Sequence, residues 1–308
     1  MKPFLHGIKS KSGGVKKDIR EIFTSINNKS LYWKFGLVFL LIVFPLLLLV
    51  TQYLVLTTIP PQFTISYLVL NFSQPTVSGM FFSNYIHTVF TFSHVLDNYN
   101  GYLLVISLLA IVYFFIIPLL KKRNILSLNY PDVAFFATSA VFFLLFPFAG
   151  SGVSVLFGRM LGQTGTWGFS GIVWAFLAYF YFLLLMLVSD MVISHFNQRS
   201  NETIKEILES ATTGTQTKRT EKPTQTTLAG SLIFLTALFI ILPLYTIFLD
   251  IGNKKINVFG HFSGFVLGFL ISALVVLICE RQDKRGKIAL IGLPAFIIGI
   301  PAVVWMVM

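Results

Sequence analysis

Residues 36–57 read GLVFLLIVFPLLLLVTQYLVLT, a run without a single charged side chain. About twenty apolar residues are what an α-helix needs to cross a lipid bilayer. Runs of this kind recur along the chain, and we expect membrane spans at about 36–57, 93–118, 132–152, 168–190, 229–250, 257–279 and 288–308. The predicted fold class is therefore an all-α polytopic membrane protein.

The composition excludes a water-soluble enzyme. Of the 308 residues 55% are hydrophobic and only 11% are charged, with a mean hydropathy of +0.79, which leaves too few polar side chains to cover a soluble surface. The only cysteine, Cys279, excludes an intramolecular disulfide and a cysteine-based zinc or iron–sulfur site. We expect no metal, no cofactor and, despite a net charge of +11, no nucleic-acid partner, because the basic residues are better explained by membrane topology.

The basic residues alternate along the chain with the expected spans. The N-terminal segment 1–35, the loop 121–123, the linker 191–228 and the loop 280–287 together carry about twenty lysines and arginines, all on one side of the membrane. The other side receives only Arg159, Lys254 and Lys255. The positive-inside rule then predicts a multi-pass protein of a prokaryotic cell membrane, with its N-terminus in the cytoplasm and its C-terminus outside.

Three segments outside the spans have distinct compositions. Segment 1–35 contains apolar residues at helical spacing, which fits either a short helix on the membrane surface or a solvated basic tail. Segment 58–92 is rich in proline and too mixed for a span, so we expect a large folded loop. The linker 191–228, rich in Thr, Glu, Lys and Ser, is predicted to be a flexible connector.

Polar residues open three of the expected spans, where they cost energy unless they are paired or hydrated. The sequences are SHVLDNYNG at 93–101, GTWGFSG at 165–171 and NVFGHFSG at 257–264, with Gly268 one turn further on. Each has a plain structural alternative. Small residues in membrane helices allow close packing, a lone histidine often binds a carbonyl, and polar residues cap helix ends.

Depth in the membrane relates these polar residues to one another. Ser170, His261 and Asn98 each precede the charged end of their span by about twenty residues, roughly 30 Å of helix. Because the second, fourth and sixth spans run in the same direction, their first turns should meet in the outer leaflet. With His94, this brings together a serine, two histidines and an asparagine, which could serve as nucleophile, general base and oxyanion donors without a metal.

At these residues the chain resembles the rhomboid family of intramembrane serine proteases. The resemblance rests on the motif GFSG at 168–171, on His261 followed by Gly264 and Gly268, and on His94 four residues before Asn98. It covers about residues 36–280 and implies a six-helix core. The span at 288–308 would be a seventh, C-terminal helix, as in the longer members of the family.

The resemblance implies a role for each matched residue. Ser170 would be the nucleophile and His261 its general base, while His94, Asn98 and the backbone N–H of Ser170 would stabilise the oxyanion. Three further features would support the site: Trp174 stacked on the histidine, Gly168 and Gly171 keeping the fourth helix close to its neighbours, and a helix contact through Gly264 and Gly268. The implied activity is endopeptidase cleavage of transmembrane protein substrates near the outer leaflet, with the lipid bilayer around the enzyme. The fifth helix and loop 250–256 would be gate and cap.

The chain also departs from the family pattern. Its first external loop lacks the Trp-Arg pair common in the family, and His87 lies two positions from where a second histidine is usual, so we expect His87 to be solvated. Asp97 is expected to face water. Two alternatives stay open: a catalytically inactive rhomboid-like protein that binds transmembrane helices, and a small-solute transporter or channel. The second would require charged residues in mid-bilayer, where the spans are almost purely apolar.

Overall fold

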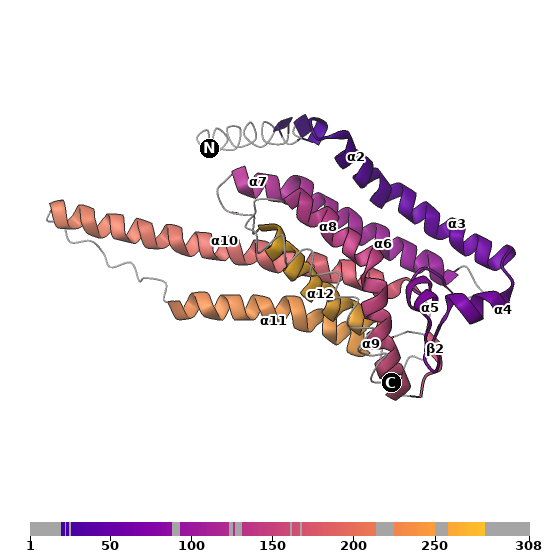
Figure 1. The fold of residues 1–308 in the computed structure, drawn as a ribbon. Coiled ribbons are helices and arrows are strands. Elements are labelled where there is room, and N and C mark those ends of the chain that lie inside the picture. Colours follow the sequence, from indigo (N-terminus) through magenta and orange to yellow (C-terminus); the bar gives the residue numbers. More distant parts are fainter. Residues whose placement is uncertain are drawn as a thin grey trace, which may run out of the picture.

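The computed structural model is built mainly from long helices that run roughly along one direction (Figure 1). It describes residues 20–21, 23–24, 26–87, 93–122, 126, 131–160, 162–166, 168–213, 225–249 and 258–280. Among these residues, four helices are long and apolar enough to cross a membrane: Leu31–Thr57, Val95–Lys122, Ser170–Gln198 and Gly260–Cys279. The chain is thus a predominantly helical protein suited to a membrane.

Helix α10 (Ser170–Thr213) lies at the centre of the bundle. It contacts α6 (Ser93–Ile111), α11 (Gln225–Leu249) and α12 (Val258–Glu280). With the N-terminal helix and the bent third segment, helices occupy six of the seven ranges expected to be spans, of which four, or five if the bent pair is one span, are long and apolar enough in the described residues to cross a membrane. The expected span at 288–308 lies outside the described residues.

The first span begins earlier than its apolar run. Helix α2 (Leu31–Val38) starts after Ser30, whose hydroxyl accepts a hydrogen bond from the backbone N–H of Trp33 at 3.3 Å. This N-cap satisfies one of the donors that a helix start leaves open. A π-helical turn, η1 (Phe39–Val43), joins α2 to α3 (Phe44–Thr57).

The third span is broken. Helices α8 (Pro131–Leu144) and α9 (Phe146–Met160) meet at an angle of 48°, where we had expected one span at 132–152. The cause is Pro147, which has no N–H to donate to the carbonyl of Phe143 one turn earlier. The hydroxyl of Tyr85 donates to this carbonyl instead. Burial raises the pKa of Tyr85, so its hydroxyl stays protonated and keeps donating.

The segment after the first span folds into short elements, as predicted for a large folded loop. They are α4 (Pro61–Phe63), a π-helical turn η2 (Thr64–Leu68), strand β1 (Leu70–Asn71) and α5 (Val77–Phe82). Strand β1 pairs antiparallel with β2 (Gly165–Thr166), so the fold is not purely helical. This pairing holds the loop beside the start of α10.

Helix α10 continues well past the expected end of the fourth span at residue 190, as Figure 1 shows. The prediction of a flexible connector over 191–228 is therefore wrong for residues 191–213. These residues contain no proline or glycine and include three glutamates and three isoleucines, so a helix already formed in the span can continue through them. Helix α11 begins at Gln225, and residues 214–224 lie outside the description.

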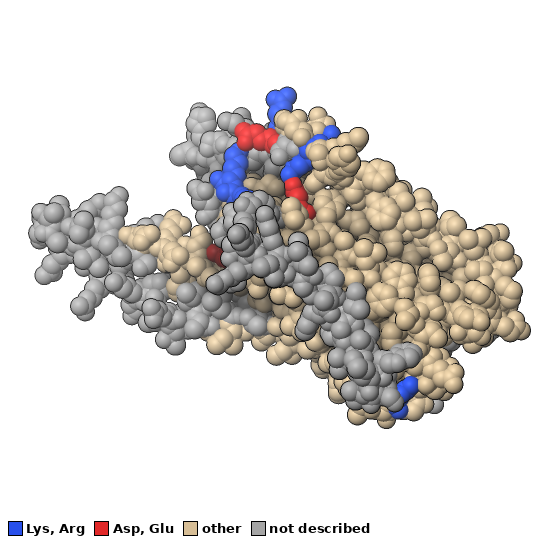
Figure 2. Space-filling view, in the orientation of Figure 1, with Lys and Arg blue, Asp and Glu red and all other residues tan. Residues whose placement is uncertain are grey.

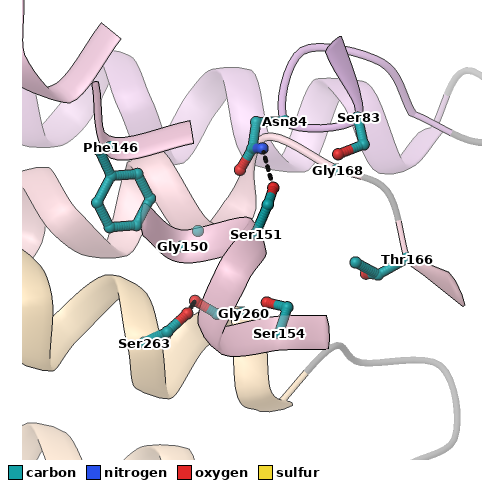
Figure 3. Close-up of a pocket in the computed structure, with 11 residues that line it drawn as sticks. Ser83, Asn84, Phe146, Gly150, Ser151, Ser154, Thr166, Gly168, Gly260 and Ser263 are labelled. Carbon is teal, nitrogen blue, oxygen red and sulfur yellow. Dashed lines mark hydrogen bonds between the residues drawn. The ribbon is translucent and has the colours of Figure 1, made fainter. Parts of the chain in front are cut away.

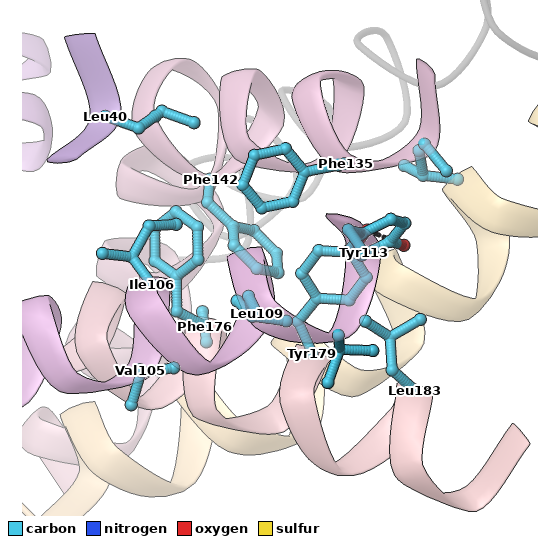
Figure 4. Close-up of a cluster of buried hydrophobic side chains, with 14 of the residues drawn as sticks. Leu40, Val105, Ile106, Leu109, Tyr113, Phe135, Phe142, Phe176, Tyr179 and Leu183 are labelled. Atoms are coloured by element: carbon cyan, nitrogen blue, oxygen red, sulfur yellow. Dashed lines mark hydrogen bonds between the residues drawn. The ribbon is translucent and has the colours of Figure 1, made fainter. Parts of the chain in front are cut away.

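An aromatic core holds α6, α8 and α10 together (Figure 4). Phe142 of α8 and Phe176 of α10 pack edge to face, with ring centroids 5.0 Å apart. The hydroxyls of Tyr113 and Tyr179 hydrogen-bond to each other in the middle of this core. Each polar group thereby satisfies the other, which removes most of the cost of burying it in an apolar interior.

Charged side chains gather at one end of the bundle (Figure 2). Lys29 pairs with Asp132 at the start of α8, and Lys122 at the end of α7 (Ile117–Lys122) pairs with Glu21 at 2.6 Å. Arg159, at the end of α9, lies at the opposite end. The described residues from 20 to 27 are helical, and the Glu21 pair fixes this segment to the bundle.

Candidate functional site

Helices α10 and α12 touch through glycines. A Cβ atom on Gly268 would lie 2.5 Å from the Cα of Ala175, and one on Gly264 would overlap the carbonyl oxygen of Gly171. Neither position leaves room for any side chain. The close-packing role expected for Gly171, Gly264 and Gly268 is therefore present, and the two backbones approach as closely as small residues permit.

This contact brings the first turns of the two helices together. Gly171, next to Ser170, faces Gly260, next to His261: a Cβ on Gly171 would lie 3.4 Å from the carbonyl oxygen of Gly260. Ser170 is the first residue of α10 and is 7% exposed. The predicted nucleophile Ser170 thus directly precedes one glycine of this backbone contact, and the predicted base His261 directly follows the other.

The ring of His261 also lies against Trp174, one turn after Ser170. The ring centroids are 5.2 Å apart and the planes are inclined by 31°, which is an offset stacking geometry. Trp174 packs in turn on Phe265, one turn after His261. The stacking that the family resemblance implied for Trp174 is present.

The turn before Ser170 has a backbone that only glycine adopts readily. Gly168 has φ +126°, and its N–H donates to the carbonyl of Ser83 at 2.7 Å. The nearest atom to a Cβ placed on Gly168 is the Ser170 Oγ, 3.9 Å away. The prediction that Gly168 keeps two helices close is therefore wrong. Its role is to let the chain turn into α10.

A polar pocket opens beside this turn (Figure 3). It adjoins Gly168, Gly171 and Gly260, which lie within two residues of Ser170 or His261. The polar residues that line it are Ser83, Asn84, Ser151, Ser154, Thr166 and Ser263. The hydroxyls that line the pocket offer a water molecule the hydrogen-bond partners that it needs.

The pocket wall is held by hydrogen bonds. Asn84 Nδ2 donates to Ser151 Oγ at 3.0 Å and to the carbonyl of Met80 at 2.8 Å, and Ser151 Oγ donates to the same carbonyl at 2.7 Å. Sequence reasoning missed these residues. The signal that could have found Ser151 and Ser154 is the run AGSGVS at 149–154, which is small and polar inside an otherwise apolar span.

The two expected oxyanion residues share one face of α6, since they are four residues apart on a helix. The side chain of Asn98 is half-buried, and its Nδ2 lies 2.9 Å from His87 Nε2. The backbone of His94 is helical one turn earlier, and its side chain lies outside the description. Asp97 is exposed, as predicted.

The prediction that His87 is solvated is wrong, because His87 is only 3% exposed. Its backbone N–H donates to Gln52 Oε1 at 2.9 Å, and its Nε2 accepts from the backbone N–H of Phe169 at 3.3 Å. Gln52, in the first span, is itself fully buried. Nothing in the local sequence around His87 marks this burial, because its partners come from three distant segments.

No family model, characterised protein or solved structure matches the chain. Among the residues that the structure describes, no group of three or more His, Cys, Asp or Glu side chains could hold a metal ion. Loop 250–256, the expected cap, lies outside these residues. The candidate site therefore combines a polar pocket with the Ser170 hydroxyl, the imidazoles of His261 and His87, and the Asn98 amide.

Proposed function

We propose that the chain is an intramembrane serine endopeptidase of the rhomboid type, which cleaves transmembrane protein substrates. The observation that carries the proposal is the stacking of His261 on Trp174 across the glycine contact between α12 and α10. This places an imidazole, held in one orientation, beside the first turn of the helix that begins with Ser170. Nucleophile and base from distant parts of the chain then share one site.

In the proposed reaction, Ser170 Oγ attacks the carbonyl carbon of the scissile peptide while His261 takes the hydroxyl proton. The tetrahedral intermediate breaks its C–N bond, and His261 returns the proton to the leaving amine. Water then attacks the acyl-enzyme in the same way and releases the second product and the free serine. No redox or metal step is needed to balance these bonds.

The start of α10 favours the negative charge that forms during the attack. Ser170 is its first residue, so its backbone N–H has no partner within the helix and points along the positive end of the helix dipole. In the proposal, Asn98 and His94 on α6 supply the further donors. Donors fixed before the reaction stabilise the transition state without reorganisation.

The polar pocket in Figure 3 suits the water that the second half of the reaction consumes. Its hydroxyls and the Asn84 amide provide hydrogen bonds that a water molecule would lose in lipid. A substrate helix hides its carbonyls in its own hydrogen bonds, so the cleaved segment has to unwind locally. We therefore propose substrates that carry helix-destabilising residues near the cut.

The site lies at the end of the bundle that carries α5 and β2, whereas α7, whose Lys122 pairs with Glu21, lies at the other end (Figure 1). Following the positive-inside rule, we propose that the site lies in the outer leaflet and the N-terminus in the cytoplasm of a prokaryotic cell. A substrate would then be cut near the outer surface of the membrane.

The proposal is tested with the full chain purified in detergent. Ser170→Ala and His261→Ala are compared with wild type for cleavage of a single-span model substrate and for labelling by a fluorophosphonate, which reacts with activated serines. Matched controls are Ser194→Ala and His195→Ala, further along the same helix α10 and distant from its first turn.

We expect the wild type and both controls to cleave and label, while Ser170→Ala does neither and His261→Ala loses nearly all of both activities. The direction follows from the loss of nucleophile or base. Equal cleavage by all five proteins would refute the proposal. Binding of the model substrate without cleavage or labelling by the wild type would favour the inactive, helix-binding alternative.

A further inference from the structure

His87 connects three elements that are far apart in the sequence. Its backbone N–H is held by Gln52 of α3, its Nε2 lies 2.9 Å from the amide of Asn98 on α6, and the same atom accepts the Phe169 N–H just before α10. The side chain is 3% exposed, so water does not replace these partners.

The direction of the bond to Phe169 fixes the chemical state of the imidazole. A backbone N–H can only donate, so Nε2 must offer a lone pair. The ring is then neutral with its hydrogen on Nδ1. Asn98 Nδ2 lies 2.9 Å from the same atom, so in this tautomer it shares the single Nε2 lone pair with the Phe169 N–H as a second donor, which turns the Asn98 amide oxygen away from this nitrogen.

These bonds act on the turn that presents Ser170. The N–H of Gly168 is held by the Ser83 carbonyl, the N–H of Phe169 is held by His87, and the Phe169 ring is fully buried. The Phe169 carbonyl, in the same peptide unit as the Ser170 N–H, accepts from the N–H of Val173 at 3.1 Å. Because that unit is planar, this bond also limits the direction of the Ser170 N–H. That N–H is the proposed backbone donor to the oxyanion.

We propose that His87 is a positioning residue, which orients both the Ser170 backbone N–H, through Phe169, and the Asn98 amide. This inference rests on the proposed function and adds a histidine that the family resemblance does not match. His87 itself does not donate to the oxyanion from Nε2, since that atom is an acceptor. It acts by holding two donors in place before the reaction.

Gln52 accepts the backbone N–H of His87, a hydrogen bond that a change of the His87 side chain leaves available. His87→Leu removes the acceptor and keeps an apolar volume. His87→Gln restores an acceptor, since a glutamine amide oxygen reaches about as far from the backbone as imidazole Nε2. The matched controls are His195→Leu and His195→Gln, at an exposed histidine of α10.

We expect His87→Leu to lower kcat roughly ten- to a hundred-fold, as for the loss of one buried hydrogen bond that orients the transition state, with KM little changed. His87→Gln should recover most of kcat, and both His195 variants should match wild type. Equal losses in the two His87 variants, no loss in either, or a change confined to KM would overturn the inference. Thermal melts in detergent show whether each variant is folded.

A second readout does not depend on activity. The full chain labelled with 15N-histidine, compared with the His87→Gln variant, gives the nitrogen resonances of His87 alone. We expect a neutral ring protonated on Nδ1. A proton on Nε2, or on both nitrogens, would overturn the inference at pH 7 whatever the kinetics. An inactive wild type with the expected resonances would refute the proposed function while leaving the His87 bonds in place.

Discussion

The Trp174 ring restricts what the His261 imidazole can do. A general base that takes a proton and later returns it has to keep the same side-chain rotamer in both steps. The stacked Trp174 ring holds His261 in one rotamer by blocking its other rotamers. Trp174 is only half-buried, so its ring adds less to the packed core than a fully buried tryptophan would. Its contribution is therefore mainly to orientation and only secondarily to the stability of the fold.

Trp174→Ala should lower kcat about ten-fold, because stacking between rings is worth about 0.5–1.5 kcal/mol beyond the buried area. Trp174→Phe keeps a ring at this place and should retain most activity. The measurement is cleavage of the model substrate alongside a thermal melt. Trp33→Phe is the matched control: Trp33 lies on α2 at the charged end, and its buried Nε1 has no hydrogen-bond partner among the described residues. Full activity of Trp174→Ala would contradict the orienting role.

Single residues show where sequence reasoning works and where it stops. That the first turns carrying Ser170 and His261 meet could be predicted, because depth in the membrane determines which residues of parallel spans lie together. The place of Trp174 beside His261 was expected only from the family resemblance. The environment of His87 could not, because it depends on how a loop folds back onto two spans. Gly168 was identified as a site residue but for the wrong reason, since a positive φ leaves no trace in spacing.

At the scale of elements, the contact between α10 and α12 builds the site. Without apolar driving force between helices in lipid, association depends on close packing, and the glycines at 171, 264 and 268 permit it. The close contact between the backbones of α10 and α12 stabilises this helix pair. It also sets the distance between the helix starts that carry Ser170 and His261. Stability and activity should therefore respond together to a change at this contact.

Gly268→Ala should destabilise the protein by about 1–3 kcal/mol and lower activity, because the added methyl would lie 2.5 Å from the Cα of Ala175 and force the helices apart. Gly264→Ala should act in the same direction. Gly230→Ala is the matched control on α11, where nothing lies within 4 Å of an added Cβ, and alanine is the better helix former. Thermal melts in detergent and substrate cleavage measure both effects. If Gly268→Ala melts like Gly230→Ala, the contact is looser than described.

The positions of the helices were predictable because long apolar runs have only one stable form in lipid. Their ends and breaks were not. The bend between α8 and α9 needs both Pro147 and a hydroxyl from elsewhere that donates a hydrogen bond to the freed carbonyl of Phe143. The extension of α10 to Thr213 continues a helix already formed in the span, through residues whose polar composition favoured a connector.

At the scale of the whole molecule, the ion pairs and the candidate site lie at opposite ends of the bundle. The pairs Lys29–Asp132 and Lys122–Glu21 lie at one end. The folded loop, the two-stranded sheet and the polar pocket lie at the other. Because basic residues are preferred on the inner side of a membrane, such a molecule should insert with its charged end inside.

Orientation can be measured with single cysteines in a Cys279→Ala background. Gln74→Cys adds a thiol to the exposed loop near the pocket, and Asn197→Cys adds one on an exposed turn of α10 at the other end. In right-side-out membrane vesicles, a membrane-impermeant maleimide should label the Gln74→Cys protein directly and the Asn197→Cys protein only after permeabilisation. The Cys279→Ala protein without an added cysteine is the control for non-specific labelling.

The reverse labelling pattern would place the pocket on the cytoplasmic side and contradict the orientation by the positive-inside rule. It would also move the proposed cleavage to the inner leaflet, while leaving the geometry of Ser170 and His261 untouched. The direction of insertion and the chemistry of the site are thus separate properties of this chain, because charge at one end sets the first and packing of α10 on α12 at the other sets the second.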